Sequence, residues 1–194
     1  MTTEIDADLK YLNEINELGF ALQQDFIVKF KQDWGLKESA AELVIQIGHL
    51  TQALIENDFI STNKHSWPQL NRKPIDNIKD ELADCFLSLC SIYGFANITE
   101  NEIKKYPYIA ILDGNYTKLA IDLQILSAQL LDSCEIFKGL KPKFNRDERA
   151  VLISCWRNLL HILTHLAEDL QYDVVSAFKE MEQDARRFLS NEKE

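Results

Sequence analysis

Apolar residues recur every three or four positions along most of this chain, and this spacing restricts its fold more than any other feature. In the first 32 residues the repeat runs through Leu12, Ile15, Leu18, Leu22, Phe26 and Phe30. Such spacing places side chains on one face of an α-helix, whereas a half-buried strand would alternate at every second residue. Only six glycines and four prolines interrupt the 194 residues, so long helices are expected.

The sequence predicts seven helices joined by polar segments. Their expected ranges are 6–32, 37–57, 75–95, a short helix after Thr99, 116–137, 147–170 and 173–191. Asp76 or Asn77 could cap the third helix, and Thr99 with Glu102 forms a capping-box pattern for the fourth. The longer polar segments, 61–74 and 138–146, are expected to be loops. We therefore predict an all-α helical bundle.

Charge and hydropathy exclude several classes of protein. The formal net charge of -10 argues against nucleic acid as a partner. It leaves room for a nucleotide, because divalent cations can bridge an acidic site and a triphosphate. Charged residues break the longest apolar stretches before they reach the ~20 residues that span a bilayer, and residues 1–10 do not resemble a signal peptide. We expect a soluble, cytoplasmic protein with no membrane partner.

The four cysteines lie in apolar runs without a CxxC pair. They are Cys85, Cys90, Cys134 and Cys155. Buried, reduced thiols are the expected state of such residues.

The two halves of the chain share a rhythm of long apolar helix, basic loop, second apolar helix and shorter amphipathic helix. Residues 37–56 can be set beside 118–135, and 81–84 beside 155–158, although any two helical hairpins look similar at this level. We interpret the rhythm as a tandem duplication. The first unit would span residues 1–110 and carry the site, and a degenerate second unit, 111–194, would pack against it.

Glu81 and Asp84 are the first candidates for chemistry. They stand three residues apart, so their carboxylates project from the same face of a helix that is apolar almost all round. Two neighbouring carboxylates on a buried helix repel each other and require a cation or hydrogen-bond donors. The alternative is that both lie on a solvent-exposed stripe beside Lys79 and Asp80.

A second polar stripe, Glu42, Gln46 and His49, follows helical spacing in the preceding apolar helix. It faces either solvent or the Glu81 and Asp84 carboxylates across the bundle. Paired acids on facing helices are a common way to build a metal site in a bundle.

Residues 43–54 and 79–89 resemble the two metal-binding helices of MazG-like nucleoside triphosphate pyrophosphohydrolases. The E-L-A-D element at 81–84 is the most specific part of this resemblance. Residues 22–34, which end at Trp34, resemble the first helix of that family, and residues 170–187 resemble its closing helix. The resemblance implies a MazG-like bundle whose two tandem units form a pseudo-dimer, as a monomer or as a homodimer of such monomers.

This chain departs from the family pattern at the first metal-binding helix. Gln46 and His49 stand where the family has two acids, so Glu81 and Asp84 remain of four carboxylates. The second half offers Gln124 and Ser127 in the corresponding region, and Asn158 where Asp84 stands. Mg²⁺ prefers hard oxygen ligands, whereas a histidine suits Mn²⁺ or Zn²⁺ better. The cofactor expected for an active site is therefore Mg²⁺ or Mn²⁺, bound with altered affinity.

The resemblance implies hydrolysis of a nucleoside triphosphate to monophosphate and pyrophosphate, with Glu81 and Asp84 as catalytic and metal-binding residues. Gln46 and His49 would complete the metal site. The expected substrate-binding residues are Lys79, Arg72, Lys73 and Trp34, although each could equally be an ordinary surface or packing residue. The alternatives are a catalytically inactive pseudoenzyme that binds nucleotide or protein, and an unrelated bundle in which E-L-A-D is coincidental.

Overall fold

The computed structural model describes residues 3–62, 78–106, 116–140 and 147–191. It contains seven α-helices and, within these ranges, no strand, which confirms the predicted all-α class. The helices are α1 (Thr3–Phe30), α2 (Leu36–Thr62), α3 (Ile78–Ala96), α4 (Glu100–Lys105), α5 (Tyr116–Phe137), α6 (Glu148–Asp169) and α7 (Val174–Asn191).

The largest difference from the expected boundaries is at the end of α2. This helix continues to Thr62 and takes in the first residues of the expected loop. Helix α3 begins at Ile78, and the expected caps Asp76 and Asn77 lie outside the described residues. The capping box at α4 is confirmed, because Thr99 accepts from the Glu102 backbone N–H and the Glu102 side chain accepts from the Thr99 N–H.

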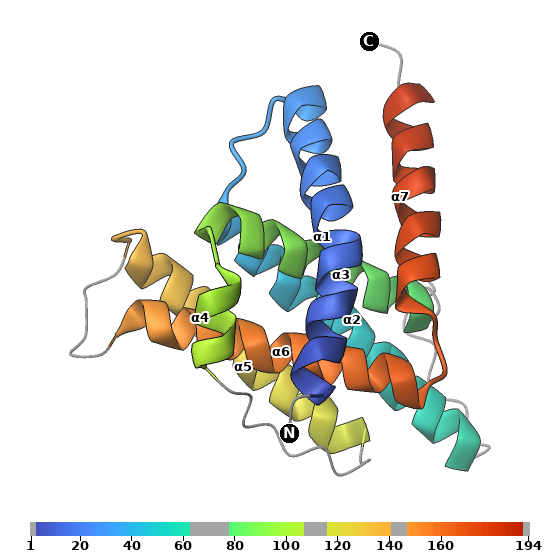
Figure 1. The fold of residues 1–194 in the computed structure, drawn as a ribbon. Coiled ribbons are helices and arrows are strands. Elements are labelled where there is room, and N and C mark those ends of the chain that lie inside the picture. The colour runs from blue at the N-terminus through green and yellow to red at the C-terminus, as the bar shows by residue number, and fades with distance from the viewer. Residues whose placement is uncertain (1–2, 63–77, 107–115, 141–146, 192–194) are drawn as a thin grey trace.

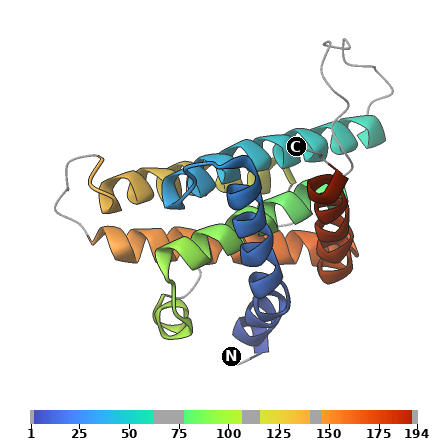
Figure 2. The same cartoon turned by 90° about the horizontal axis from the view of Figure 1, so that it is seen from above.

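Four long helices form the centre of the bundle in two layers. Helix α2 packs along both α3 and α5, and α6 packs along both α5 and α3. Seen from above in Figure 2, α2 and α5 lie on one side, while α3 and α6 lie next to them. The apolar stripes of these helices meet in a continuous core, with Leu43, Leu89, Leu123 and Leu159 fully buried.

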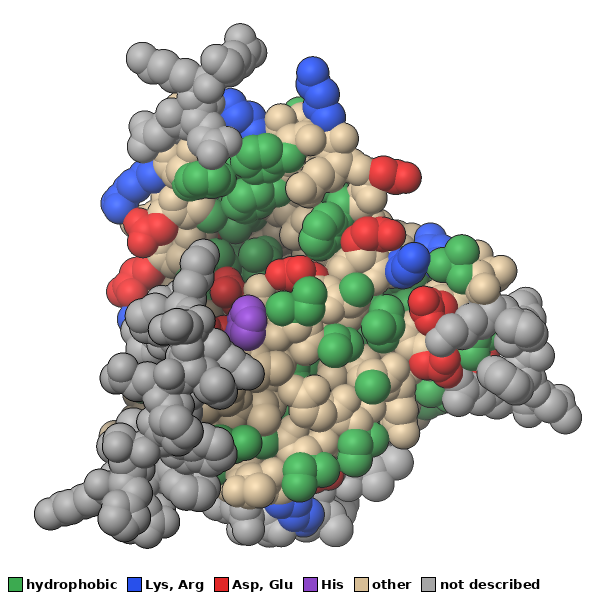
Figure 3. Space-filling view, turned by 180° about the vertical axis from the view of Figure 1, so that it is seen from behind, with side chains coloured by type: hydrophobic (Ala, Val, Ile, Leu, Met, Phe, Trp, Pro, Cys, Tyr) green, Lys and Arg blue, Asp and Glu red, His purple; other side chains and the backbone are tan. Residues whose placement is uncertain are grey.

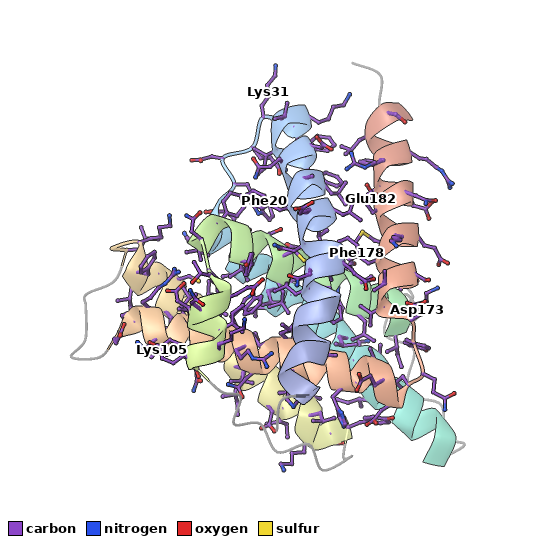
Figure 4. The ribbon with its side chains drawn as sticks, in the orientation of Figure 1. Phe20, Lys31, Lys105, Asp173, Phe178 and Glu182 are labelled. Carbon is purple, nitrogen blue, oxygen red and sulfur yellow. The ribbon has the colours of Figure 1, made fainter. Side chains whose placement is uncertain are left out.

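Helices α1 and α7 pack against α3 and against each other. The C-terminal ends of α1 and α7 extend beyond the four central helices (Figure 1). Gly94 lets α1 approach α3 closely, because a Cβ at that position would lie 2.4 Å from the Phe20 ring. Phe20 on α1 and Phe178 on α7 both point inward (Figure 4), and Phe178 is fully buried.

The indole of Trp156 joins α6 to α3 by a hydrogen bond. Trp156 is fully buried, and its Nε1–H donates to the Leu89 carbonyl oxygen over 3.0 Å. That carbonyl lies within the apolar body of α3, so the bond satisfies the one polar atom of the Trp156 side chain. Tyr93 lies beside the indole, with 5.6 Å between ring centroids.

Helix α3 ends without a glycine. Asn97 adopts a positive φ of 50°, and the Ile98 N–H donates to the Tyr93 carbonyl over 3.1 Å. This is the hydrogen bond of a left-handed helix end, which asparagine tolerates better than most residues.

Arg149 of α6 forms hydrogen bonds both to this end of α3 and to α4. Its guanidinium donates to the carbonyl oxygens of Ala96 and Asn97, at 2.6 and 3.0 Å. It also donates to both carboxylate oxygens of Glu102, at 3.0 and 2.9 Å. These bonds from Arg149 lower the pKa of Glu102 from 4.5 to about 2.

All four cysteines are buried and none forms a disulfide, as expected. Burial raises the pKa of the Cys134 thiol to about 12, so this thiol is protonated at neutral pH.

The Arg149–Glu102 contact predicts a specific dependence of stability on pH. Because folding lowers the pKa of Glu102, its stabilisation is fully present above pH 4.5 and is lost as the pH falls through about 2. Glu102→Gln should lower the free energy of unfolding by roughly 1 kcal/mol at pH 7 and weaken the loss of stability in acid. Urea unfolding from pH 7 to pH 2 measures both effects.

Glu100→Gln is the matched control, since it removes an exposed charge from the same short helix. An equal effect of both substitutions would contradict the assigned role of Arg149.

Candidate functional site

The structure brings together the two predicted metal-binding helices at His49 and Glu81. His49 Nδ1 on α2 lies 3.7 Å from Glu81 Oε2 on α3. The Glu81 side chain is 7% exposed, whereas that of His49 is 52% exposed. The polar stripe of α2 therefore reaches α3 at this point, and the alternative that placed Glu81 on a solvent-exposed stripe is wrong.

A line of hydrogen-bonding side chains leads along α2 to this pair. Gln46 Nε2 donates to Glu42 Oε1 over 2.8 Å, which turns the Gln46 amide oxygen toward His49. That oxygen lies 3.3 Å from His49 Nδ1. His49 Nδ1 thus stands between two oxygen acceptors, Gln46 Oε1 and Glu81 Oε2, an arrangement that favours a proton on Nδ1.

Asp84 lies one turn after Glu81 on α3 and is half-buried. Cys85 follows directly after Asp84 and is fully buried. Burial raises the pKa of the Cys85 thiol well above its usual value, and the negative charges of Asp84 and Glu81 raise it further.

The oxygen and nitrogen donors fit a divalent cation only loosely. His49 Nδ1 lies 3.3 Å from Gln46 Oε1 and 3.7 Å from Glu81 Oε2. Asp84 lies on the adjacent turn of α3. Across the part of the chain that the structure describes, no three His, Cys, Asp or Glu side chains are grouped as a metal site. Ligation by His49 Nδ1 would first require loss of the proton that its two oxygen neighbours favour.

Of the predicted substrate-binding residues, Lys79 takes part in an ion pair. Its Nζ lies 2.8 Å from Glu180 Oε2 on α7, and this hydrogen bond raises the pKa of Lys79. A phosphate group would have to compete with Glu180 for this amine. Arg72 and Lys73 lie outside the described residues.

Trp34 precedes α2 and is half-buried. Its Nε1–H donates to the buried Ser39 hydroxyl over 3.0 Å, and the nearby Gly35 N–H donates to Glu38 Oε2 over 3.1 Å. These bonds connect the α1–α2 turn to the first turn of α2. A stacking role for Trp34 stays a prediction.

Between α5 and α6, a side-chain hydrogen bond joins Gln129 and Cys155. The Cys155 thiol of α6 donates to Gln129 Oε1 over 3.7 Å. Gln124 instead donates to Thr51 of α2 over 3.2 Å, and Ser127 donates to the Gln124 carbonyl. The correspondence of Gln124 and Ser127 with Gln46 and His49 stays a prediction.

The surface around the α2–α3 contact is mixed in character. Figure 3 shows acidic side chains and a histidine near one another on the face seen from behind, with hydrophobic side chains gathered in the upper part of that face and scattered over the rest. The exposed hydrophobic residues include Ile45 on α2 and Ile121 and Ile125 on α5, each about half exposed.

No known protein family, curated protein or solved structure matches the chain. None of the helices that the structure describes is both long enough and apolar enough to cross a membrane.

The bond between Trp34 and Ser39 should be measurable as a coupling in stability. Trp34→Phe leaves the buried Ser39 hydroxyl without this donor, and Ser39→Ala removes the acceptor. Each substitution should lower the free energy of unfolding by about 1 kcal/mol or more, with a coupling of roughly 0.5–1.5 kcal/mol in a double-mutant cycle. Additive losses in urea unfolding would show that the hydrogen bond contributes nothing.

Proposed function

We propose that the chain is a MazG-like nucleotide pyrophosphohydrolase with an altered metal site. The observation that supports this proposal best is the approach of His49 Nδ1 to the buried Glu81 carboxylate, at 3.7 Å. These residues come from the two helices that resemble the metal-binding helices of that family. A buried carboxylate that faces a second polar helix is a suitable place for a divalent cation.

The proposed reaction adds water to a nucleoside triphosphate and yields a monophosphate and pyrophosphate. A bound Mg²⁺ or Mn²⁺ would neutralise the phosphates and activate the attacking water. Glu81 and Asp84 would hold the cation together with Gln46 and His49, and one of the two carboxylates would accept the proton of that water. Glu42 would orient the Gln46 amide so that its oxygen faces the site.

The proposal extends to the arrangement of the two halves. Helices α2 and α3 would form one unit and α5 and α6 the other, paired within one chain as a pseudo-dimer. The contacts of α2 with α5 and of α3 with α6 support this pairing. In this arrangement the second unit is a structural partner of the first and has no acids at the Cys155 and Asn158 positions.

The second candidate function is a catalytically inactive relative that binds nucleotide or a protein. The observation that favours it is the small ligand set: the described residues contain no group of three His, Cys, Asp or Glu side chains around Glu81. The proton that is favoured on His49 Nδ1 would also compete with a cation for that nitrogen.

Substitution of Asp84 separates the two candidates. Asp84→Asn removes one charge from the proposed cation site while keeping the side-chain size. It should abolish pyrophosphate release from a panel of NTPs and dNTPs, and it should weaken Mn²⁺ binding by about tenfold or more. Calorimetric titration and a pyrophosphate assay measure these effects.

Asp80→Asn is the matched control, because Asp80 is an exposed carboxylate one turn earlier on α3. It should leave both quantities unchanged. Absence of metal binding and of turnover in the unmodified chain would contradict the enzyme proposal and favour the inactive relative.

Restoring the acids on α2 should strengthen the site. Gln46→Glu combined with His49→Glu would place four carboxylates on the facing helices and remove the proton of His49. Mg²⁺ affinity should rise by about tenfold or more, since Mg²⁺ prefers charged oxygen ligands. Calorimetry measures the gain against the unmodified chain. An unchanged affinity would mean that Gln46 and His49 do not face the cation.

A further inference from the structure

A groove of about 690 Å³ lies between α5 and α6, beside the end of α4. Its volume falls within the range that is usual for small-molecule sites. The apolar part of its lining includes Ile125 and Leu126 of α5 and Val151 of α6. Ile125 is half exposed, so a ligand in the groove would remove apolar surface from water.

The uncharged polar groups among the described lining residues are two amides, a thiol and the hydroxyls of Tyr106 and Ser154. Gln129 of α5 and Asn158 of α6 line the groove, and Asn158 is buried. The Cys155 thiol donates to Gln129 Oε1, and the Asn158 amide donates to the Ser154 carbonyl over 2.7 Å. These bonds fix the amides in position, and an amide side chain can both donate to and accept from a ligand.

The described lining of the groove contains one basic and one acidic side chain, so their charges cancel. Among its lining residues, Lys118 and Asp122 carry opposite charges and stand one helical turn apart on α5. Among the described residues, the lining therefore has no concentration of carboxylates that would attract a cation and no cluster of basic groups for an anion.

We propose that this groove binds an uncharged small molecule that has a planar ring and an amide-like hydrogen-bonding edge. The ring would lie against Ile125, Leu126 and Val151, and the edge would meet Gln129 and Asn158. Mostly apolar walls with a few fixed hydrogen-bonding groups are typical of such sites. The proposal does not depend on metal binding or turnover at Glu81, so the two can fail separately.

Benzamide is a suitable probe because it combines an uncharged ring with an amide. In ¹H–¹⁵N spectra of the full chain, benzamide should cause saturable shifts of resonances from α5 and α6. Benzoate and benzamidine keep the ring but carry a negative and a positive charge, and each should bind about tenfold more weakly or not at all.

Ile125→Glu should weaken benzamide binding by about tenfold or more, because it places a charge on the apolar wall. Ile121→Glu is the matched control: Ile121 is 54% exposed, against 50% for Ile125, and it lies one turn away outside the groove. Gln129→Ala is a second variant, which should weaken binding if Ile125→Glu fails to fold.

Saturable benzamide shifts that Ile125→Glu or Gln129→Ala removes, and that Ile121→Glu retains, would establish the site. Three results would overturn the proposal: no saturable shifts with benzamide, equal binding of the charged probes, or equal weakening by the variants inside and outside the groove.

Discussion

Helix α3 packs against α1, α2, α6 and α7, and the rest of the structure depends on this central position. Its side chains are buried on nearly every face, with Leu82, Phe86, Leu89 and Cys90 at most 2% exposed. Glu81 is buried among these side chains because it belongs to the same helix. Burying a carboxylate is costly without a polar partner, and His49 Nδ1 of α2 lies 3.7 Å from Glu81 Oε2, within ion-pair range but beyond a hydrogen bond. The same packing that builds the core thus creates the candidate site.

The contacts within two of the helix pairs differ in chemistry. Between α2 and α3, the contact joins an imidazole and a carboxylate, His49 and Glu81. Between α5 and α6, it joins an amide and a thiol, Gln129 and Cys155. The first pair includes a buried carboxylate. The second pair is neutral, and it borders an open, mostly apolar groove.

Much of the fold could be predicted from the sequence because apolar spacing reports helical faces directly. The ranges of α5, α6 and α7 agree with expectation to within a residue or two, and the capping box at Thr99 is confirmed. The end of α2 at Thr62 was not predicted, because serine, threonine and asparagine are common in loops and carry little information on where a helix stops.

The contacts that define the site were harder to predict. The spacing of Glu42, Gln46 and His49 identified a shared face, and the choice between solvent and α3 required the packing. Lys79 meets Glu180, and Arg149 meets the end of α3, across long stretches of sequence that no local pattern connects. The α5 neighbour of Cys155 could not be predicted for a similar reason. Gln124, Ser127 and Gln129 are all polar, and only the three-dimensional arrangement selects Gln129 as the neighbour of Cys155.

The central claim is that the His49 ring directs its Nδ1 toward the buried Glu81 carboxylate between α2 and α3. ¹⁵N NMR of the His49 ring tests it most directly, because the chemical shifts of the two ring nitrogens report which one carries the proton. We predict a protonated Nδ1 in the metal-free chain and loss of that proton on addition of Zn²⁺, with both features altered by Glu81→Gln. A His49 ring protonated only at Nε2, with no response to Zn²⁺ or to Glu81→Gln, would contradict the account.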